Sequence, residues 1–457
     1  MRKRIVVTGV GIISPIGNTA SESWENAIAG RSGVRRMTIV DPEEFPSQIS
    51  GEVKNFDPLD YLDHKLAKRT DRYSQFSIVA SREAYSDSGL EGNINPERLG
   101  VIIGSGIGGI TTLEKEHKVA LERGVRRINP FFCPMMISNI AAGRVGIDIC
   151  AKGLNFATVT ACASSGHAIA VATDMIRLGR ADAILAGGSE APLTLTGVGG
   201  FCALKALSTR NDDPETASRP FDRDRDGFVI AEGGAVVVLE DLEHAINRGA
   251  HIYAEVVGSG MTCDAFHITA PSEGAEGSAR AMKLAMEDAG IEPEQVDYIN
   301  AHGTSTVLND KNETTAIKTA LGEEKARRIK VSSTKSVTGH MLGAAGAIEA
   351  IFASFALRDG IVPPTATLVN PDEGCDLDYV PGRARKAELT YVLSNSLGFG
   401  GHNVTLALKK YIGEVIQMTG HPVSEVEKIL GYRFSNPDLL EKALTHSSCT
   451  ESSQLRR

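Results

Sequence analysis

The feature that most constrains the fold is a repeated series of short β-branched runs that end in small residues. In the first half these runs are IVVTGVG from Ile5, VIIGSGIGG from Val101, ATVTACAS from Ala157, AILAGGSEA from Ala183 and AVVVLEDL from Ala235. The second half gives AEVVGSG from Ala254, YINAHGTST from Tyr298, KVSSTKS from Lys330, YVLSNSLGFGG from Tyr391 and VTLALKK from Val404. Stretches with helical period, such as SARAMKLAMEDAG and GAIEAIFASFALRDG, lie between them. Apolar strands that alternate with helices predict an α/β fold with covered sheets, built as two similar halves packed in layers.

Composition excludes several classes of function. A net charge of −9, from 48 basic and 57 acidic residues, argues against a general nucleic-acid binder. The seven cysteines are scattered without a CxxC pair, which favours reduced thiols in a cytosolic setting over a disulfide framework or a zinc site. The start, MRKRIVVTGVGIISPIG, resembles a signal peptide superficially, but Gly9, Gly11 and Pro15 interrupt it and favour a buried strand. No apolar run approaches the ~20 residues that span a bilayer.

The stretch TACASSGH raises the question of whether Cys162 is a nucleophile or a small packing residue. When this stretch is aligned with STKSVTGH at an offset of 173 residues, Gly166-His167 matches Gly339-His340. Cys162 then matches Lys335. Both positions are predicted strand-to-helix turns. A helix N-terminus favours a thiolate, whereas many buried cysteines are only small hydrophobes, so position alone leaves both interpretations open.

Further reactive side chains follow other predicted strand ends, where ligand sites of α/β folds gather. His302 lies in NAHGTST, and Lys335 and His340 lie in TKSVTGH. Most of the other histidines are interpreted as surface or core residues, but these two follow glycine-flanked strand ends opposite the cysteine and can converge on one thiol. The glycines of NSLGFGGHN would free backbone N–H groups for an oxyanion hole, although a tight turn explains that segment equally well.

Together, TACASSGH, NAHGTST, STKSVTGHMLGAAGAIEA and NSLGFGGHN resemble the motif series of the thiolase-fold condensing enzymes. The Cys-His-His set resembles the elongating β-ketoacyl-acyl-carrier-protein synthases, whereas initiating synthases pair histidine with asparagine and thiolases use a second cysteine. The stretches GVGGFCALKALSTRNDDPETASRPFDRDRDGFVIAEG and VPPTATLVNPDEGCDLDYVP resemble the type II, long-chain-extending members. The resemblance covers about residues 3–410. It departs at Val307, where proline is common, and at Leu397, where phenylalanine is common, which bears on loop rigidity and pocket shape.

The resemblance implies duplicated βαβαβαββ halves in a layered α-β-α-β-α core, with the nucleophile in residues 1–250 and both histidines in residues 251–412. It implies that an acyl chain moves from a carrier-protein thioester to Cys162. Loss of carbon dioxide from malonyl carrier protein then leaves an enolate, which His302 and His340 stabilise as neutral Nε2–H donors. The carbanion attacks the acyl-cysteine and lengthens the fatty acyl chain by two carbons.

The resemblance also implies supporting residues and partners. The supporting residues are a pair that orients the histidines (Lys335, Glu349), an oxyanion donor and gate (Phe399), acyl-pocket residues (Ile107, Phe201), residues for the pantetheine arm (Thr304, Thr306) and a glycine at the substrate (Gly398). The expected partner is an acyl carrier protein, and the chain is expected to be a cytoplasmic homodimer without nucleic-acid or membrane partners. No metal or cofactor is expected, because the substrate thioesters carry phosphopantetheine.

Three segments imitate other sites. GVGIIS near Gly9 and GSGIGG near Gly104 echo dinucleotide-binding loops, but neither has G-x-G-x-x-G followed by an acidic residue at the right distance. DRDRDGFVIAEG from Asp222 nearly spells a calcium loop, but Glu232 falls one position early. We discount the first two segments and interpret the third as a structural turn.

Recognition of the carrier protein is predicted for LDHKLAKRTDRYSQF. Lys65, Lys68, Arg69 and Arg72 fall at i, i+3, i+4 and i+7, so one helix would display them as a single basic stripe. Most such stripes are solvated faces, but this one could receive an acidic carrier protein. The further basic residues expected to help are Arg126, Arg127 and Lys205.

Residues 413–457 do not belong to this pattern. HPVSEVEKILGYRFSNPDLLEKALTHSSC carries a Ser424/Glu427 capping box and an Asn436-Pro437 helix start, and it resembles the beginning of a ribonuclease III domain. The acidic metal-binding segment of that family is missing, so an appendage without nuclease activity is predicted.

Three alternative functions remain for comparison. A non-catalytic subunit that sets chain length would lack the cysteine. An RNA-processing protein is suggested only by the tail, and the net charge opposes it. A degradative thiolase would cleave acetoacetyl-CoA without malonyl-dependent condensation.

Overall fold

The predicted strand runs form one ten-stranded sheet in the computed structural model, which describes residues 2–412. The first half contributes β1 (Ile5–Ile13), β4 (Leu99–Gly104), β5 (Asn155–Phe156), β6 (Ala183–Glu190) and β7 (Gly233–Asp241). The second half contributes β8 (Ala254–Cys263), β9 (Val296–Asn300), β10 (Lys330–Ser332), β13 (Tyr391–Gly398) and β14 (His402–Lys409). One run differs, because ATVTACAS begins just after β5. There the chain leaves the sheet to hydrogen-bond the start of the next helix, with Thr160 N–H donating to Ser164 Oγ at 2.9 Å.

Strand order repeats between the halves. The order is β1-β7-β6-β4-β5 in the first half and β8-β14-β13-β9-β10 in the second. In each half the first two pairs of neighbouring strands in this order are antiparallel, and the last two pairs are parallel. The halves meet where Ile5–Val7 pairs with Ala254–Val256. The predicted duplication is therefore confirmed.

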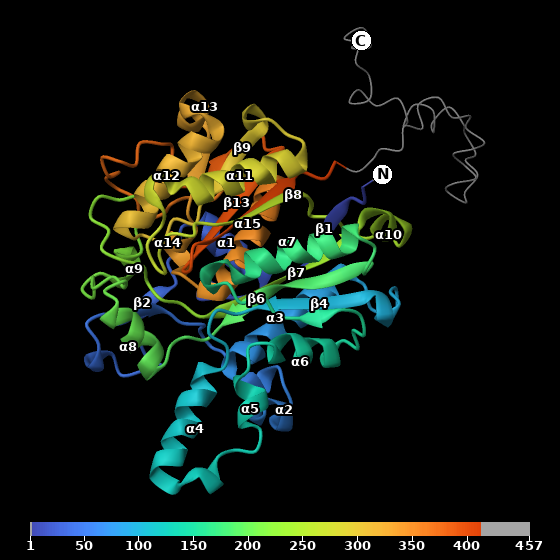
Figure 1. Ribbon diagram of the computed structural model, residues 1–457, viewed down its shortest axis with the longest axis vertical. Coiled ribbons are helices and arrows are strands. Elements are labelled where there is room, and N and C mark those ends of the chain that lie inside the picture. Colours follow the sequence, from blue (N-terminus) through green and yellow to red (C-terminus); the bar gives the residue numbers. More distant parts are fainter. Residues whose placement is uncertain (1, 413–457) are drawn as a thin grey trace, which may run out of the picture. The chain divides into compact units, whose positions relative to one another are not determined.

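Helices complete the expected layers (Figure 1). The central helices α7 (Ser164–Arg177) and α15 (Ala345–Asp359) contact each other and strands of both halves. The outer helices are α3 (Arg72–Ser88) and α6 (Ile140–Asp148) on the first half, and α11 (Glu276–Ala289) and α12 (Val307–Leu321) on the second. The α-β-α-β-α arrangement is thus confirmed, with the largest apolar cluster around the central helices.

Apart from α4, which has 14 residues, the remaining α-helices have nine residues or fewer. The helices are α1 (Ala20–Ile28), α2 (His64–Lys68), α4 (Ile110–Arg123), α5 (Phe132–Met136), α8 (Leu195–Ala203), α9 (Pro214–Ala217), α10 (Leu242–Asn247), α13 (Glu323–Arg328) and α14 (Lys335–Thr338). Two small ribbons pair β2 (Val34–Arg36) with β3 (Ile49–Gly51) and β11 (Ile361–Val362) with β12 (Arg385–Lys386). Within residues 2–412 no helix is long and apolar enough to cross a membrane. The ribonuclease III-like segment, 413–457, lies outside the described residues.

The glycines shared by IVVTGVG and AEVVGSG have a packing role. A Cβ on Gly11 would lie 2.0 Å from the carbonyl oxygen of Ala80 in α3. A Cβ on Gly260 would lie 2.0 Å from the carbonyl oxygen of Ala281 in α11. Each glycine therefore lets an outer helix approach the first strand of its half, which accounts for the GVG stretch without a nucleotide site.

The turns before the two central helices are also equivalent. The 3₁₀ turn η5 (Ala161–Ala163) precedes α7, and η8 (Leu342–Ala344) precedes α15. Each begins with a non-glycine residue in the left-handed region, with φ of 50° at Ala161 and 45° at Leu342. Such residues cost on the order of 1–3 kcal/mol each, so surrounding packing must hold both turns.

This equivalence corrects the offset inferred from the Gly-His pairs. In the structure Cys162 is equivalent to Gly343, because each is the second residue of its turn. The predicted alignment of Cys162 with Lys335 was therefore wrong. The cause is α14 and the turn after it, which lie between β10 and α15 and have no counterpart between β5 and α7. That extra segment supplies both Lys335 and His340.

Candidate active site

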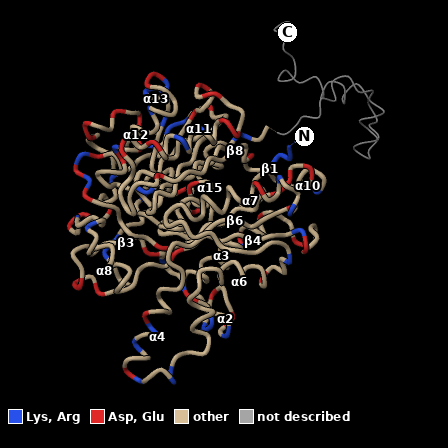
Figure 2. Tube along the Cα trace, viewed as in Figure 1, with Lys and Arg blue, Asp and Glu red and all other residues tan. Residues whose placement is uncertain are grey.

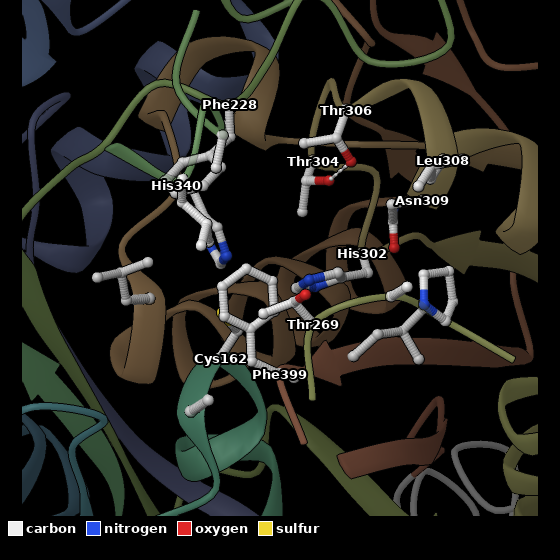
Figure 3. A pocket seen from close by; sticks show the side chains of 18 of the residues that line it. Cys162, Phe228, Thr269, His302, Thr304, Thr306, Leu308, Asn309, His340 and Phe399 are labelled. Atoms are coloured by element: carbon white, nitrogen blue, oxygen red, sulfur yellow. Dashed lines mark hydrogen bonds between the residues drawn. The ribbon is translucent and has the colours of Figure 1, made fainter. Parts of the chain in front are cut away.

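Four of the predicted residues converge on one cavity of about 420 Å³ (Figure 3). Cys162 follows β5, His302 follows β9, His340 lies between α14 and η8, and Phe399 follows β13. The first comes from one half of the fold and the other three from the second half. Parallel strands of both halves thus direct their carboxyl ends to the same site.

Close backbone packing sets the position of Cys162. A Cβ on Gly398 would lie 2.6 Å from the carbonyl oxygen of Thr160 and 3.3 Å from the backbone nitrogen of Cys162, so only glycine allows this approach. The approach directs the backbone N–H groups of Cys162 and Phe399 at the Cys162 sulfur, where they lower the thiol pKa. Two N–H groups aimed at one reacting atom are the geometry of an oxyanion hole.

Burial nevertheless dominates the ionisation of Cys162. The residue is 8% exposed, and loss of solvent raises the pKa of the thiol to about 12, against the opposing effect of the Lys335 charge. The predicted helix N-terminus is present, but the thiolate that it was expected to favour is not the resting form, because desolvation of the anion outweighs the nearby positive groups.

Alkylation of Cys162 should therefore lack a plateau at neutral pH. Only the thiolate reacts, so the iodoacetamide rate at Cys162 should rise about tenfold per pH unit from roughly pH 7 to 9.5. Peptide mass spectrometry of the substrate-free protein measures this rate, with exposed Cys263 as the internal comparison. A rate that levels off near pH 7 would show a low-pKa thiolate.

His302 is held by charged groups on two sides. Glu313 in α12 accepts the backbone N–H groups of His302 at 2.8 Å and Gly303 at 2.7 Å. Lys335 Nζ lies 3.3 Å from His302 Nδ1 and can only donate, which leaves the ring hydrogen on Nε2. Burial and the Lys335 charge lower the His302 pKa well below 6.5. The ring is thus a neutral Nε2–H donor.

His340 is neutral for the same reasons. Burial and the charge of Lys335 lower its pKa well below 6.5. Its ring lies edge-on to that of His302, with centroids 5.2 Å apart, and edge-on to Phe228 at 5.3 Å. Within the described residues its Nδ1 has no hydrogen-bond partner, so no bond fixes its tautomer.

Lys335 and Glu349 form the predicted supporting pair. Lys335 Nζ donates to Glu349 Oε1, and the two side chains are 1% and 2% exposed. Burial raises the Glu349 pKa to about 7 against the opposing effect of the Lys335 charge. Lys335 hydrogen-bonds the His302 ring directly. It acts on His340 only through the electrostatic effect of its positive charge.

The cavity has an apolar wall and a polar wall. Ile107 and Phe201 pack with Cys162 and Phe228 in one apolar cluster. On the polar wall the Thr304 and Thr306 hydroxyls hydrogen-bond each other at 2.9 Å (Figure 3). All six predicted pocket residues line the cavity: Ile107, Phe201, Thr304, Thr306, Gly398 and Phe399. Lys205 also lines it, as do Val307 and Leu397, the two positions that depart from the family pattern.

Sequence reasoning missed the carboxylate behind the Ile107 loop. Fully buried Glu190 accepts from Ser105 Oγ at 2.8 Å, Gly106 N–H at 2.7 Å and Ile107 N–H at 3.1 Å. It also accepts from Gly343 N–H at 3.0 Å, which ties the two halves together. The glycine loop GSGIGG thus presents its N–H groups to a protein carboxylate. Nothing in the spacing of the sequence indicated this role or that of Glu313.

The basic stripe is not continuous. Helix α2 ends at Lys68, and Arg72 begins α3, whose N-cap is Asp71. Arg72 donates to buried Glu232 at 2.8 Å from Nε and 2.7 Å from Nη2. The single-helix prediction was wrong because Asp71 caps a new helix, which its position in the pattern did not reveal.

The other predicted carrier residues differ in exposure. The guanidinium of half-buried Arg69 stacks over Phe131 at 4.3 Å from the ring centroid. Basic residues remain visible on α2 and at the tip of α4 (Figure 2). The exposed ones are Lys65, Lys68, Arg126, Arg127 and Lys205.

The calcium-like segment forms the predicted turn. Asp222 accepts the backbone N–H groups of Asp224, Val369 and Asn370 at 2.8–2.9 Å. Asp226 accepts the backbone N–H of Thr209 at 2.9 Å. Between residues 2 and 412 no three acidic, histidine or cysteine side chains are placed to hold a metal ion.

Comparison with known proteins agrees with this geometry. The family models of the beta-ketoacyl synthase N-terminal and C-terminal domains match residues 2–245 and 253–369. The 3-oxoacyl-[acyl-carrier-protein] synthase 2 of Staphylococcus aureus is 53% identical over 410 residues, covering 90% of this chain and 99% of the relative.

Solved structures give the same assignment. A beta-ketoacyl synthase from Burkholderia phymatum superposes with a TM-score of 0.83 at 37% identity, covering 90% of this chain and all of the other. A complex described as a type II PKS acyl-carrier protein with its ketosynthase bound to the hexaketide matches with a TM-score of 0.83 at 36% identity and the same coverage. With two family models matched and close relatives at this identity, the chain belongs to the beta-ketoacyl synthase family.

Proposed function

We propose a division of roles among these residues for the reaction that this beta-ketoacyl synthase catalyses. That reaction is the decarboxylative condensation of an acyl thioester with malonyl-acyl-carrier-protein, and it lengthens a fatty acyl chain by two carbons. The observation that supports the roles best is the meeting of Cys162, His302 and His340 from both halves in one cavity. Malonyl-dependent formation of a 3-oxoacyl product by purified protein tests the reaction, and acetoacetyl-CoA cleavage alone would indicate a thiolase.

Cys162 accepts the acyl chain in the first step. Its sulfur attacks the thioester carbon, the carbon–sulfur bond to the carrier breaks, and the thiol proton leaves on the carrier thiol. No external base has to hold that proton, which suits a cysteine whose pKa is raised by burial. The N–H groups of Cys162 and Phe399 stabilise the tetrahedral oxyanion.

The histidines act in the second step. The malonyl thioester carbonyl accepts from His302 and His340, and the electron pair of the breaking bond to carbon dioxide forms the enolate. The enolate carbon attacks acyl-Cys162, the carbon–sulfur bond to Cys162 breaks, and the departing thiolate takes up a proton from solvent water. Side chains and backbone groups supply every step, so the proposal keeps the expectation that the protein needs no cofactor.

An acyl carrier protein is the proposed partner, supported by the carrier–ketosynthase complex among the similar structures. Lys205 stands at the cavity and is exposed, which suits contact with an acidic carrier beside the entering arm. Lys65 and Lys68 present exposed charges on α2. Arg72 is omitted from the proposal because Glu232 neutralises it.

Charge reversal at these lysines should weaken carrier use selectively. Lys205→Glu, and separately Lys65→Glu with Lys68→Glu, are expected to raise KM for the acyl carrier protein about tenfold at low salt. Turnover of acyl-CoA should stay within about twofold, because rim charges act mainly on encounter.

Lys386→Glu is the matched control for these variants. It reverses an exposed lysine on β12, which pairs with β11 beyond the carboxyl end of α15, away from the cavity. Steady-state kinetics with both substrates measure the effect. Equal losses on carrier and CoA substrates would assign the lysines a structural role.

We further propose that the chain is a homodimer. Strand β5 is the last strand of the sheet, and within residues 2–412 no strand pairs with its outer edge. Phe156 in this strand and Val159, three residues further along the chain, are exposed. An exposed apolar edge strand favours pairing with a second copy, and a monomer in sedimentation would contradict this.

A cytoplasmic location remains a proposal that the six described free thiols support.

A further inference from the structure

The polar wall of the cavity rests on the segment that imitates a calcium loop. Ser305, between the two cavity threonines, accepts the backbone N–H of Arg219 on its hydroxyl at 2.9 Å. Its carbonyl accepts the backbone N–H of Gly227 at 3.2 Å. The segment 219–227 therefore lies directly behind the threonine loop.

Arg225 makes the densest contacts between these two segments. Its side chain is 1% exposed and donates from Nε to the Thr306 carbonyl at 3.1 Å and from Nη2 to the Val307 carbonyl at 2.8 Å. Its Nη1 donates to Asp222 O at 2.7 Å and to Asp372 Oδ2 at 2.9 Å. One planar guanidinium thus joins the turn, the threonine loop and a carboxylate in a fixed geometry.

The threonine loop needs such support. Gly303 has φ of 37° and Ser305 has φ of 69°, and the second value is strained for a residue with a side chain. Thr304 and Thr306 line the cavity on either side of that strained residue. The loop keeps this shape only where its surroundings hold it.

We propose that Arg225 is a positioning residue that fixes Thr304 and Thr306 for the arm of the substrate thioester. The inference rests on the proposed function together with the arm-binding role that the family resemblance implies for these two threonines. Arg225 does not line the cavity and does not touch the reacting atoms. Its effect reaches the substrate through the backbone of the loop, and therefore concerns the amides of the arm and not the acyl chain.

Arg225→Lys tests this with the charge preserved, since complete removal would leave the carboxylates of Asp310 and Asp372 without their buried cation. A lysine cannot reproduce the guanidinium fork. We expect KM for loading of Cys162 from acyl-CoA, which carries the arm, to rise about tenfold with kcat within about twofold. Loading from the S-phenyl thioester of the same acyl chain, which has no arm, should change less than about twofold.

A second variant guards against a folding defect. Asp372→Asn weakens the ion pair that holds the Arg225 guanidinium, at its more exposed partner. It should produce a smaller arm-dependent rise in KM, about threefold. Lys311→Met is its control, because Lys311 pairs with Asp372 at 3.2 Å from the outside and makes no bond to the threonine loop. Thermal unfolding of each variant reports whether the fold is intact.

Thr304→Val and Thr306→Val separate this inference from the proposed function. If the threonine variants lose arm-dependent binding and Arg225→Lys does not, the arm subsite stands and the role of Arg225 is overturned. If the threonine variants lose nothing, both the subsite and the inference fail. Equal losses by Arg225→Lys on the two thioesters, in a folded protein, would also overturn the inference, because the effect would then not pass through the arm.

Discussion

Cys162→Ala is expected to reduce condensation to background while leaving the fold intact. Without the sulfur no acyl-enzyme forms, and no other described cysteine lines the cavity to replace it. The fold should persist because the substitution removes one buried atom from an apolar cluster that also contains Phe228 and Leu342. Product formation by mass spectrometry and the melting temperature measure the two effects.

Cys202→Ala is the matched control. Cys202 packs against the same apolar cluster but does not line the cavity, so its loss should leave condensation near the wild-type rate. Condensation by Cys162→Ala at an undiminished rate would refute the acyl-cysteine route. A non-catalytic chain-length subunit would show no activity even in the unmodified protein.

Strand ends explain how far the sequence alone could lead. The runs around Ala157, Tyr298, Lys330 and Tyr391 each end in small residues and then in a reactive side chain, and a duplicated α/β sheet must bring such ends together. Cys162, His302 and His340 were predicted in this way, aided by the family resemblance, whereas Phe399 was predicted from the resemblance alone. The layers followed from the same alternation of apolar strands and helices.

Tertiary contacts account for what the sequence could not provide. Glu313 reaches the His302 loop from the second turn of α12, and Glu190 reaches Gly343 across the two halves, so neither has a local pattern. The Arg72 side chain fits a helical stripe by spacing, yet Asp71 caps a new helix before it. The Cys162 pKa depends on burial, which the helix N-terminus does not reveal.

Replacing His302 or His340 with alanine is expected to slow carbon dioxide release from malonyl carrier protein about 100- to 1000-fold, the usual effect of losing one oxyanion donor. Loading of Cys162 should be spared, because the proposed oxyanion hole of that step consists of the N–H groups of Cys162 and Phe399. Radiolabelled carbon dioxide release and mass-spectrometric detection of the acyl-enzyme separate the two steps. His117→Ala, on the exposed face of α4 and outside the cavity, is the control.

Two further observations distinguish a neutral donor from an acid. Burial and the Lys335 charge hold both histidine pKa values well below 6.5, so decarboxylation should not decline between about pH 6.5 and 8, where an imidazolium donor would lose its proton. His302→Gln, which keeps an N–H donor without a titrating ring, should recover part of the loss caused by alanine. If each alanine variant still decarboxylates near the wild-type rate, the enolate is stabilised elsewhere. In that case the Lys335–Glu349 pair would orient a ring that does not take part in the chemistry.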